Sequence, residues 1–287
     1  MRKIHSIIAT IAVALLLGGA DPAAAHSYTQ HNLVSDIPGL ADLTDPSLVN
    51  PWGLVASSTS PWWVANNGTA TSTLYNGNTG AKVALTNLPC HCVIVPGAPT
   101  GIVFNGPPFT TGTGFVVTSG GASGPARFIF ASEDGSISGW NPAVPTPVPP
   151  PPPVSSQAVI AVPPSDGAVY KGLAIASTIP GNVAGDFLYA ANFRAGTVDV
   201  FDHNFVKLPQ GRFIDHRIPE GYAPFGIQNI GGIIYVTYAL QNEEKKGRRA
   251  RQGPWVRERV RHQRQTDSPC RVAGHTEFSV GIGARAG

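Results

Sequence analysis

Short apolar stretches separated by polar turns recur along most of this chain. Residues 187–192 (FLYAAN) are apolar, a turn containing Gly196 follows, and polarity then alternates over residues 197–202 (TVDVFD). An apolar strand, a glycine-containing turn and an alternating strand are typical of a β-hairpin. Residues 62–76 and 128–141 have the same order. The pattern therefore predicts a hairpin in each of these three segments.

Each predicted hairpin is preceded by a glycine and an aliphatic residue at the start of another strand. These openings read NPWGLV, APTGIV and VYKGLA, and a fourth, APFGIQ, precedes the apolar segment Ile233–Tyr238. Intervals of 48, 71 and 54 residues separate the four glycines, which are Gly53, Gly101, Gly172 and Gly226. Repeats of about 50 residues with roughly four short strands each are typical of β-propeller blades.

A β-sandwich also places short strands at such spacings, but recurrence of the whole two-part unit favours the propeller. The sequence therefore predicts an all-β fold, a β-propeller with blades of the YVTN or NHL kind. Three blades and part of a fourth are too few to close a ring of the usual size. We therefore expect the propeller to be incomplete.

The two ends of the chain differ from the repeats. A basic start, an apolar run over residues 7–17 and the small residues Ala23 to Ala25 predict a secretory signal peptide over residues 1–25. The apolar run is too short to span a membrane. The mature chain, with the partial propeller at residues 26–242, is therefore expected to be exported to the periplasm, the cell surface or the medium, with no membrane span.

A Pro-rich stretch interrupts the second repeat. Residues 143–156 contain the run PTPVPPPPP, which favours a stiff polyproline II segment. We expect this insert to be a surface linker within the propeller and not a boundary between domains. It also accounts for the longest interval between the repeat glycines.

The last 45 residues have a composition of their own. Residues 243–287 hold 11 Lys and Arg against 5 Asp and Glu, a net charge of +6, whereas residues 1–242 have a net charge of −3. Three interpretations are open: a translation in the wrong reading frame, a disordered tail, or a basic arm for an anionic partner. An exported protein seldom meets nucleic acid, so we expect no nucleic-acid partner.

Composition excludes some classes of protein and leaves the chemistry open. With 13% charged and 42% hydrophobic residues, the chain is not intrinsically disordered. It has no G-x-S-x-G, H-E-x-x-H or Walker motif. Cys90 and Cys92 flank His91 and offer two thiols and one imidazole to a soft metal ion. Two ordinary thiols, or a strained local disulfide, is the simpler interpretation, because no further ligands are apparent.

Several long phrases resemble a known family. The segments LVSDIPGLADLTDPSLVNPWGL, FIFASEDGSISGWNP and GYAPFGIQNIGGIIYVTYA are similar to those of an uncharacterised family of exported bacterial β-propeller proteins, some of which carry PEP-CTERM sorting tails. The resemblance covers residues 28–241. It implies further blades beyond Ile233–Tyr238, where this sequence departs from the pattern near Asn242, and it implies no established activity or catalytic residue.

The candidate site residues follow the first strand of each hairpin. Asn66, Glu133 and Asn192 stand there, and oxygen atoms converging at one mouth of a propeller would suit Ca²⁺. Turn geometry is the alternative reason for Asn and Glu at hairpin ends. Trp52, with Trp62 and Trp63, is a candidate aromatic binding platform, although blade packing is the commoner use of tryptophan.

The predicted function is that of an exported binding or interaction scaffold, encoded by a truncated or frame-shifted copy. Its partner would be another protein, an extracellular small molecule or a glycan, and no cofactor is firmly implied. The alternative is a calcium-assisted hydrolase of the lactonase or esterase type, in which the metal polarises a carbonyl group. That alternative depends on analogy between folds.

Overall fold

A computed structural model describes residues 29–147, 154–179, 183–209, 213, 218–248 and 263–264. The chain divides into two units, Met1–Asn32 and Leu33–Gly287, and the strands described below belong to the second. The predicted signal peptide, the centre of the Pro-rich insert and most of the tail after residue 248 lie outside the described residues.

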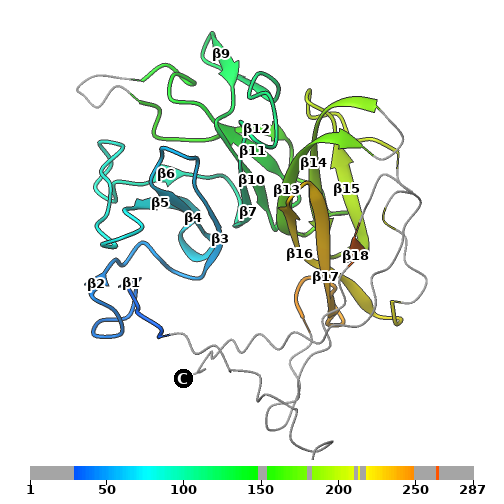
Figure 1. Ribbon diagram of the computed structural model, residues 1–287, viewed down its shortest axis with the longest axis horizontal. Coiled ribbons are helices and arrows are strands. Elements are labelled where there is room, and N and C mark those ends of the chain that lie inside the picture. Colours follow the sequence, from blue (N-terminus) through cyan, green and yellow to red (C-terminus); the bar gives the residue numbers. More distant parts are fainter. Residues whose placement is uncertain are drawn as a thin grey trace, which may run out of the picture. The chain divides into compact units, whose positions relative to one another are not determined.

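Four successive antiparallel sheets, called blades 1 to 4, make up most of the second unit (Figure 1). Within each blade, consecutive strands are hydrogen-bonded neighbours, apart from one hairpin inserted in blade 2. Blade 1 has β3 (Pro51–Val55), β4 (Trp62–Asn66), β5 (Thr71–Tyr75) and β6 (Val93–Ile94); blade 2 has β7 (Pro99–Phe104), β10 (Phe128–Ser132), β11 (Ile137–Trp140) and β12 (Val159–Val162); blade 3 has β13 (Tyr170–Ile179), β14 (Val183–Asn192) and β15 (Thr197–Phe201); blade 4 has β16 (Tyr222–Ile230), β17 (Ile233–Leu240) and β18 (Gln263–Arg264).

The three predicted hairpins are confirmed. They correspond to β4–β5, β10–β11 and β14–β15. Glycine serves the turns of the last two, where Gly135 and Gly196 have φ of 81° and 72°, because this left-handed region costs a residue without Cβ very little. In the first turn, the short 3-10 segment η1 (Asn67–Thr69) is followed by Ala70 with φ of 52°.

Two strand pairs were not predicted. β8 (Val116–Ser119) and β9 (Ala122–Pro125) form a hairpin between β7 and β10. The 71-residue interval between repeat glycines therefore contains this hairpin as well as the Pro-rich insert. Before blade 1, β1 (Val34–Ser35) and β2 (Leu43–Thr44) form a short parallel pair.

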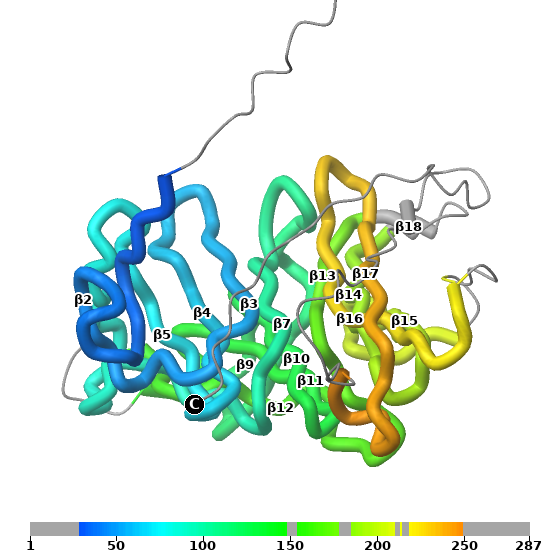
Figure 2. Tube along the Cα trace, turned by 90° about the horizontal axis from the view of Figure 1, so that it is seen from below, coloured from blue at the N-terminus to red at the C-terminus, as the bar shows by residue number. Residues whose placement is uncertain are grey.

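The blades pack in chain order through their first strands. β3 contacts β7, β7 contacts β13, and β13 contacts β16, and Figure 2 shows these strands side by side. A separate hydrophobic core fills each gap, with Trp63 and Phe130 between blades 1 and 2, Ile129 and Leu188 between blades 2 and 3, and Tyr189 and Val236 between blades 3 and 4. The fold is a β-propeller, incomplete over the described residues, as predicted.

Blade 4 extends further than its sequence pattern suggests. Recognisable strand character ends at Tyr238, yet the predicted tail contributes β18, whose Arg264 is in register with Tyr235 of β17. A turn begins the tail, in which Asn242 N donates to Gly247 O at 2.8 Å.

The ends of the Pro-rich insert are built into blade 2. Val144 is buried in the core between blades 2 and 3. Ser155 is also buried, and its carbonyl oxygen accepts a hydrogen bond from Trp140 Nε1 at 2.8 Å. Residues 148–153, which contain most of the prolines, lie outside the described residues.

Candidate functional site

A β-bulge interrupts the first strand of every blade at the repeat glycine or at the residue before it. In β3 the pairing skips from Pro51 to Leu54, so Trp52 and Gly53 have no partner in register. The same skip leaves out residues 171–172 of β13 and residues 225–226 of β16, and in β7 it leaves out Thr100. Because a bulge redirects the side chain at that point of a strand, it determines where the residue before each glycine points.

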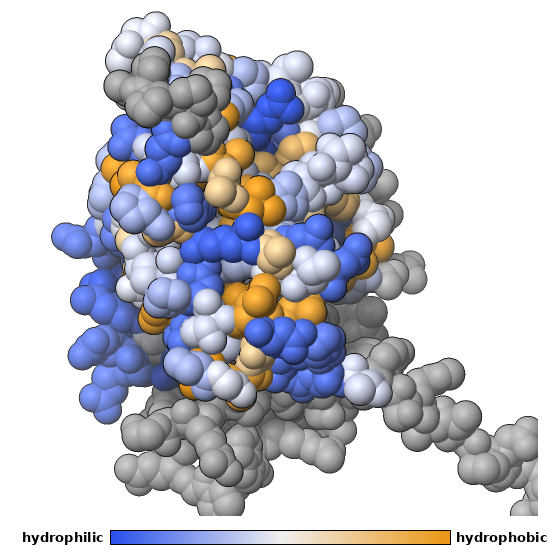
Figure 3. All heavy atoms as spheres, turned by 90° about the vertical axis from the view of Figure 1, so that its left-hand side faces the viewer, coloured by the Kyte–Doolittle hydropathy of each residue, from blue (hydrophilic) through white to orange (hydrophobic). Residues whose placement is uncertain are grey.

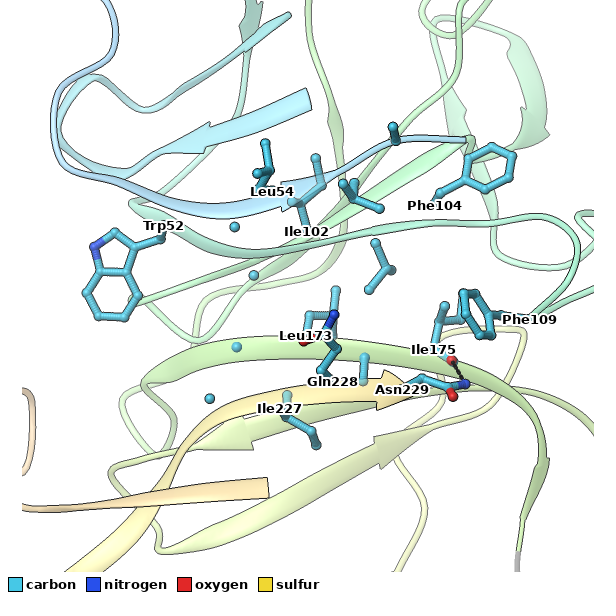
Figure 4. A pocket seen from close by; sticks show the side chains of 18 of the residues that line it. Trp52, Leu54, Ile102, Phe104, Phe109, Leu173, Ile175, Ile227, Gln228 and Asn229 are labelled. Carbon is cyan, nitrogen blue, oxygen red and sulfur yellow. Dashed lines mark hydrogen bonds between the residues drawn. The ribbon is translucent and has the colours of Figure 1, made fainter. Parts of the chain in front are cut away.

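The four first strands line most of a channel of about 480 Å³. Figure 4 shows Trp52 at one end of it, Phe104 and Phe109 at the other, and aliphatic side chains between them. The volume lies within the usual range of about 300–1,000 Å³ for small-molecule pockets. Its walls are mostly apolar side chains and the backbone of the repeat glycines, including Ile102, Leu173, Ile175 and Ile227.

Aromatic rings and one cation gather at the Trp52 end of the channel. The ring centroids of Trp52 and Phe225 are 5.5 Å apart, and Lys171 Nζ lies 5.2 Å from the centroid of the Trp52 ring. Phe225 also packs edge-on against Phe193, with centroids 5.5 Å apart. Trp52, Lys171 and Phe225 come from blades 1, 3 and 4, so only the tertiary structure brings them together.

Lys171 is held by an ion pair with Glu133 from blade 2. The side chain of Lys171 is only 4% exposed, and that of Glu133 is 32% exposed. The other carboxylate oxygen of Glu133 accepts a hydrogen bond from Asn67 Nδ2 at 3.2 Å. A buried ammonium group needs such a partner. Glu133 therefore compensates the positive charge of Lys171 at the Trp52 end of the channel, which we call the mouth.

The predicted site residues Asn66 and Asn192 stabilise their own hairpins. Asn66 Nδ2 donates to Thr73 Oγ1 at 2.9 Å, and Asn192 Nδ2 donates to Asp199 Oδ2 at 2.9 Å. Asn192 Oδ1 accepts from the backbone nitrogen of Ala195 at 3.1 Å. Both asparagines are fully buried and hold the ends of paired strands together.

Asp199 is the centre of a buried polar group in blade 3. Besides Asn192, it accepts hydrogen bonds from Tyr170 at 3.1 Å and from Lys207 at 2.7 Å. Burial, together with the neighbouring Asp199 carboxylate, raises the pKa of Tyr170 well above its usual value. Tyr170 is therefore a neutral hydrogen-bond donor to the carboxylate.

Glu133 is not the structural equivalent of the two asparagines. In the register of the blades, Asn66 pairs with Pro51 and Asn192 with Tyr170, and the residue that pairs with Pro99 is Ser132. The predicted equivalence is therefore wrong by one residue. Side chains alternate between the two faces of a strand, and this shift gives Glu133 surroundings different from those of the asparagines.

The sequence reasoning found Trp52 but missed Lys171 and Phe225. A signal for them exists, because all three precede a repeat glycine, as does Thr100 in blade 2. Thr100 is buried and donates to Tyr170 O at 2.7 Å. Comparison of this one position across the four openings would have identified the residues around the axis.

The calcium site remains a prediction. Within the described part of the chain, no three His, Cys, Asp or Glu side chains lie together as a metal-binding group. Glu133 is paired with Lys171, and the amide oxygen of Asn192 is occupied by backbone N–H groups.

Cys90 and Cys92 form a disulfide in the structure. This agrees with one of the two simpler interpretations of the pair. The two sulfur atoms are therefore not thiolates available to a soft metal ion.

Comparisons with known proteins give relatives without assigned functions. The chain is 31% identical over 216 residues to uncharacterized protein L690 of Acanthamoeba polyphaga mimivirus, which covers 73% of this chain and 52% of the relative. It is 33% identical over 217 residues to uncharacterized protein R648 of the same virus, covering 73% and 48%. The chain thus spans about half the length of these relatives.

No family model matches the chain, and the expected bacterial family is not identified by these comparisons. Solved structures with a similar fold include a streptogramin B lyase, with 13% identity, a TM-score of 0.39, and 65% of this chain and 47% of the lyase covered. Another is hydrazine synthase of Kuenenia stuttgartiensis, with 14% identity, a TM-score of 0.41, and coverage of 72% and 46%.

The assignment of the fold as a β-propeller depends on the arrangement of the four blades in the structure. Among the described residues there is no helix with the length and apolar character needed to cross a membrane.

Proposed function

We propose that this protein is an exported binding scaffold that takes a small ligand into the channel between its four first strands. The observation that carries the proposal is the channel itself, which has a volume of about 480 Å³ and an aromatic mouth formed by Trp52 and Phe225. A mainly apolar pocket with a few polar groups at one end is the usual form of a small-molecule site.

The lining indicates the chemistry of the ligand. Ile102, Leu173 and Ile227 offer apolar walls, and the Trp52 ring offers a face for stacking. The charged pair of Lys171 and Glu133 lies beside this ring. We therefore expect a molecule with an apolar or aromatic body that enters the channel and a polar end that stays at the mouth, such as a small amphipathic metabolite or a glycan ring.

Export is the second part of the proposal. It is supported by the apolar segment before residue 25 and by the Cys90–Cys92 disulfide, because disulfides persist mainly in oxidising compartments. Fractionation of cells that produce the full chain, followed by mass spectrometry, tests it. We expect an exported form that begins near His26 with oxidised cysteines, and a cytoplasmic form that retains Met1 would contradict export.

Ligand binding is tested with the fluorescent probe 1-anilinonaphthalene-8-sulfonate, whose aromatic body and sulfonate suit the channel and its mouth. We expect one probe molecule per chain and at least about tenfold weaker binding after Trp52→Ala, since loss of a stacked ring costs about 1.4 kcal/mol or more. The control is Trp62→Ala, which removes an exposed indole of the same blade that does not line the channel.

Two results would overturn the proposal. The first is equal binding by the wild type and Trp52→Ala. The second is an equal loss in Trp62→Ala, which would indicate adsorption to exposed apolar surface in place of a site.

A further inference from the structure

The three interfaces between blades repeat one contact. At each of them, an aliphatic residue in the first strand of a blade lies over the repeat glycine of the preceding blade. A methyl group on that glycine would lie 2.4–3.1 Å from the backbone nitrogen of the aliphatic residue, so a side chain there would force the strands apart at Gly53 and Gly101 and crowd them at Gly172. The three glycine–aliphatic contacts are Gly53 with Ile102, Gly101 with Leu173, and Gly172 with Ile227.

Both halves of a fourth contact of this kind are open among the described residues. Gly226 has the same place in blade 4, but a methyl group there would meet only Thr237 Oγ1 of its own blade. Leu54 has the same place in blade 1 and is 59% exposed. The corresponding aliphatic residues of the other blades are 5–9% exposed, and they are Ile102, Leu173 and Ile227.

The surface of blade 4 around Gly226 has an apolar character. On β17, Ile234 and Val236 are buried in the core against blade 3. Because side chains alternate along a strand, Ile233 and Tyr235 belong to the opposite face, and both are half-buried. A strand that is apolar on both faces is typical of a sheet covered on both sides.

The surface of blade 1 and the segment before it is also apolar. Of the eleven large hydrophobic residues exposed among the described residues, six lie between positions 37 and 62. Figure 3 views this side of the unit and shows hydrophobic side chains exposed between hydrophilic ones. Leu48 and Val34 pack against part of the blade at Val64 and Tyr75, but they leave Leu54 open.

We propose that a second copy of this chain docks head to tail, with its Leu54 over Gly226 of the first copy. The two open halves are complementary and lie on the same chain, so each copy offers both. Two copies with four blades each would form one ring of eight, the upper end of the usual range, and both open contacts would be made. The relatives, of which this chain spans about half, are about twice as long as the segment that they share with it.

A contact between different surfaces of two copies makes a specific prediction about variants. We use the full exported chain and measure its mass by light scattering during size-exclusion chromatography. The wild type is expected to have twice the mass of one chain. In a pair of identical copies, each of the two contacts contains one residue 54 and one residue 226. Either substitution, Leu54→Arg alone or Gly226→Arg alone, therefore places a charge in both contacts. Each is expected to raise the dissociation constant at least about tenfold.

Mixing the two variants is the decisive experiment. A Leu54→Arg copy retains its glycine, and a Gly226→Arg copy retains its leucine, so one contact is intact in the mixed pair. We expect the mixture to recover dimers that neither variant forms alone. Ile160→Arg is the matched control, because Ile160 is exposed on β12, away from both surfaces, and it should remain dimeric.

Several outcomes would overturn the proposal. A monomeric wild type would mean that something other than a second copy covers the Gly226 surface, such as the segment after residue 248. Dimers that survive both substitutions, or variants that do not rescue each other, would place the association elsewhere, and assemblies larger than two copies would exclude the closed ring. If Gly226→Arg does not fold, Ile233→Arg on the same surface replaces it.

Discussion

Gly101 of β7 lies so close to Leu173 of β13 that a methyl group on the glycine would be 2.4 Å from the leucine backbone nitrogen. No real Cβ contact with backbone is so short, and neither strand can move without opening a core. The same kind of contact explains the glycine in the first three openings, at Gly53, Gly101 and Gly172, and it leads to the first prediction.

Gly101→Ala is expected to destabilise the protein by about 1–3 kcal/mol or more, because it forces two blades apart. The control is Gly167→Ala, since Gly167 lies in an exposed loop where the nearest atom to an added methyl group is Ser165 Oγ at 3.6 Å. Chemical denaturation of the wild type and both variants provides the measurement. Equal stability of the two variants would contradict the role of Gly101.

The asparagine in blade 3 is expected to contribute to stability and not to ligand binding. Asn192→Ala removes a buried donor to Asp199 and an acceptor for backbone N–H groups, which should cost about 1–3 kcal/mol. Asn204→Ala, at an exposed position, should change stability little. The free energy of unfolding and the affinity for the fluorescent probe are measured together. A folded, stable Asn192→Ala variant that loses probe binding would return Asn192 to the ligand site.

Glu133→Gln distinguishes an ion pair from a metal ligand. The substitution leaves the Lys171 ammonium group, which is only 4% exposed, without its counter-charge, so we expect a loss of about 1–3 kcal/mol. Glu220→Gln, at an exposed residue, is the control. We expect Ca²⁺ to leave the melting temperature of the wild type unchanged. A rise with Ca²⁺ that disappears in Glu133→Gln would support the calcium site, because a ligand stabilises the state that binds it.

Acid is expected to weaken the attachment of the segment before blade 1. Asp45 is buried and accepts from Tyr75 at 2.6 Å and Lys82 at 2.6 Å. Burial raises the pKa of Asp45, but Lys82, Tyr75 and the backbone of Ser47 outweigh it and hold the pKa below its usual value. The carboxylate therefore stabilises the fold fully above the unfolded pKa of about 3.9, and this contribution is lost as the pH falls through the folded pKa.

The measurement compares the wild type with Asp45→Asn across a pH series. The difference in free energy of unfolding should be largest near neutral pH and should shrink below about pH 4. Asp166→Asn, at an exposed aspartate, should show a smaller difference at every pH. A difference between wild type and Asp45→Asn that is independent of pH would show that Asp45 contributes by shape alone.

Part of the candidate site was predictable from sequence. Trp52 stands out because it precedes the first repeat glycine, and Lys171 and Phe225 occupy the same position in later repeats. The assignment of Glu133 failed because β10 ends at Ser132, which pairs with Pro99, so that Glu133 lies one residue beyond the position of the two asparagines. A hairpin pattern identifies the two strands but does not reveal the residue at which each strand ends.

Local alternation and turn residues such as Gly135 and Gly196 were enough to predict the all-β class, the repeat of about 50 residues and the hairpins. The residues that surround the channel, and the open positions of Leu54 and Gly226 among the described residues, became evident only from the packing of the blades. A blade buries its faces only against other blades. The contacts that fix Trp52 beside Lys171 and Phe225 therefore join residues from three repeats, and no local pattern in the chain encodes them.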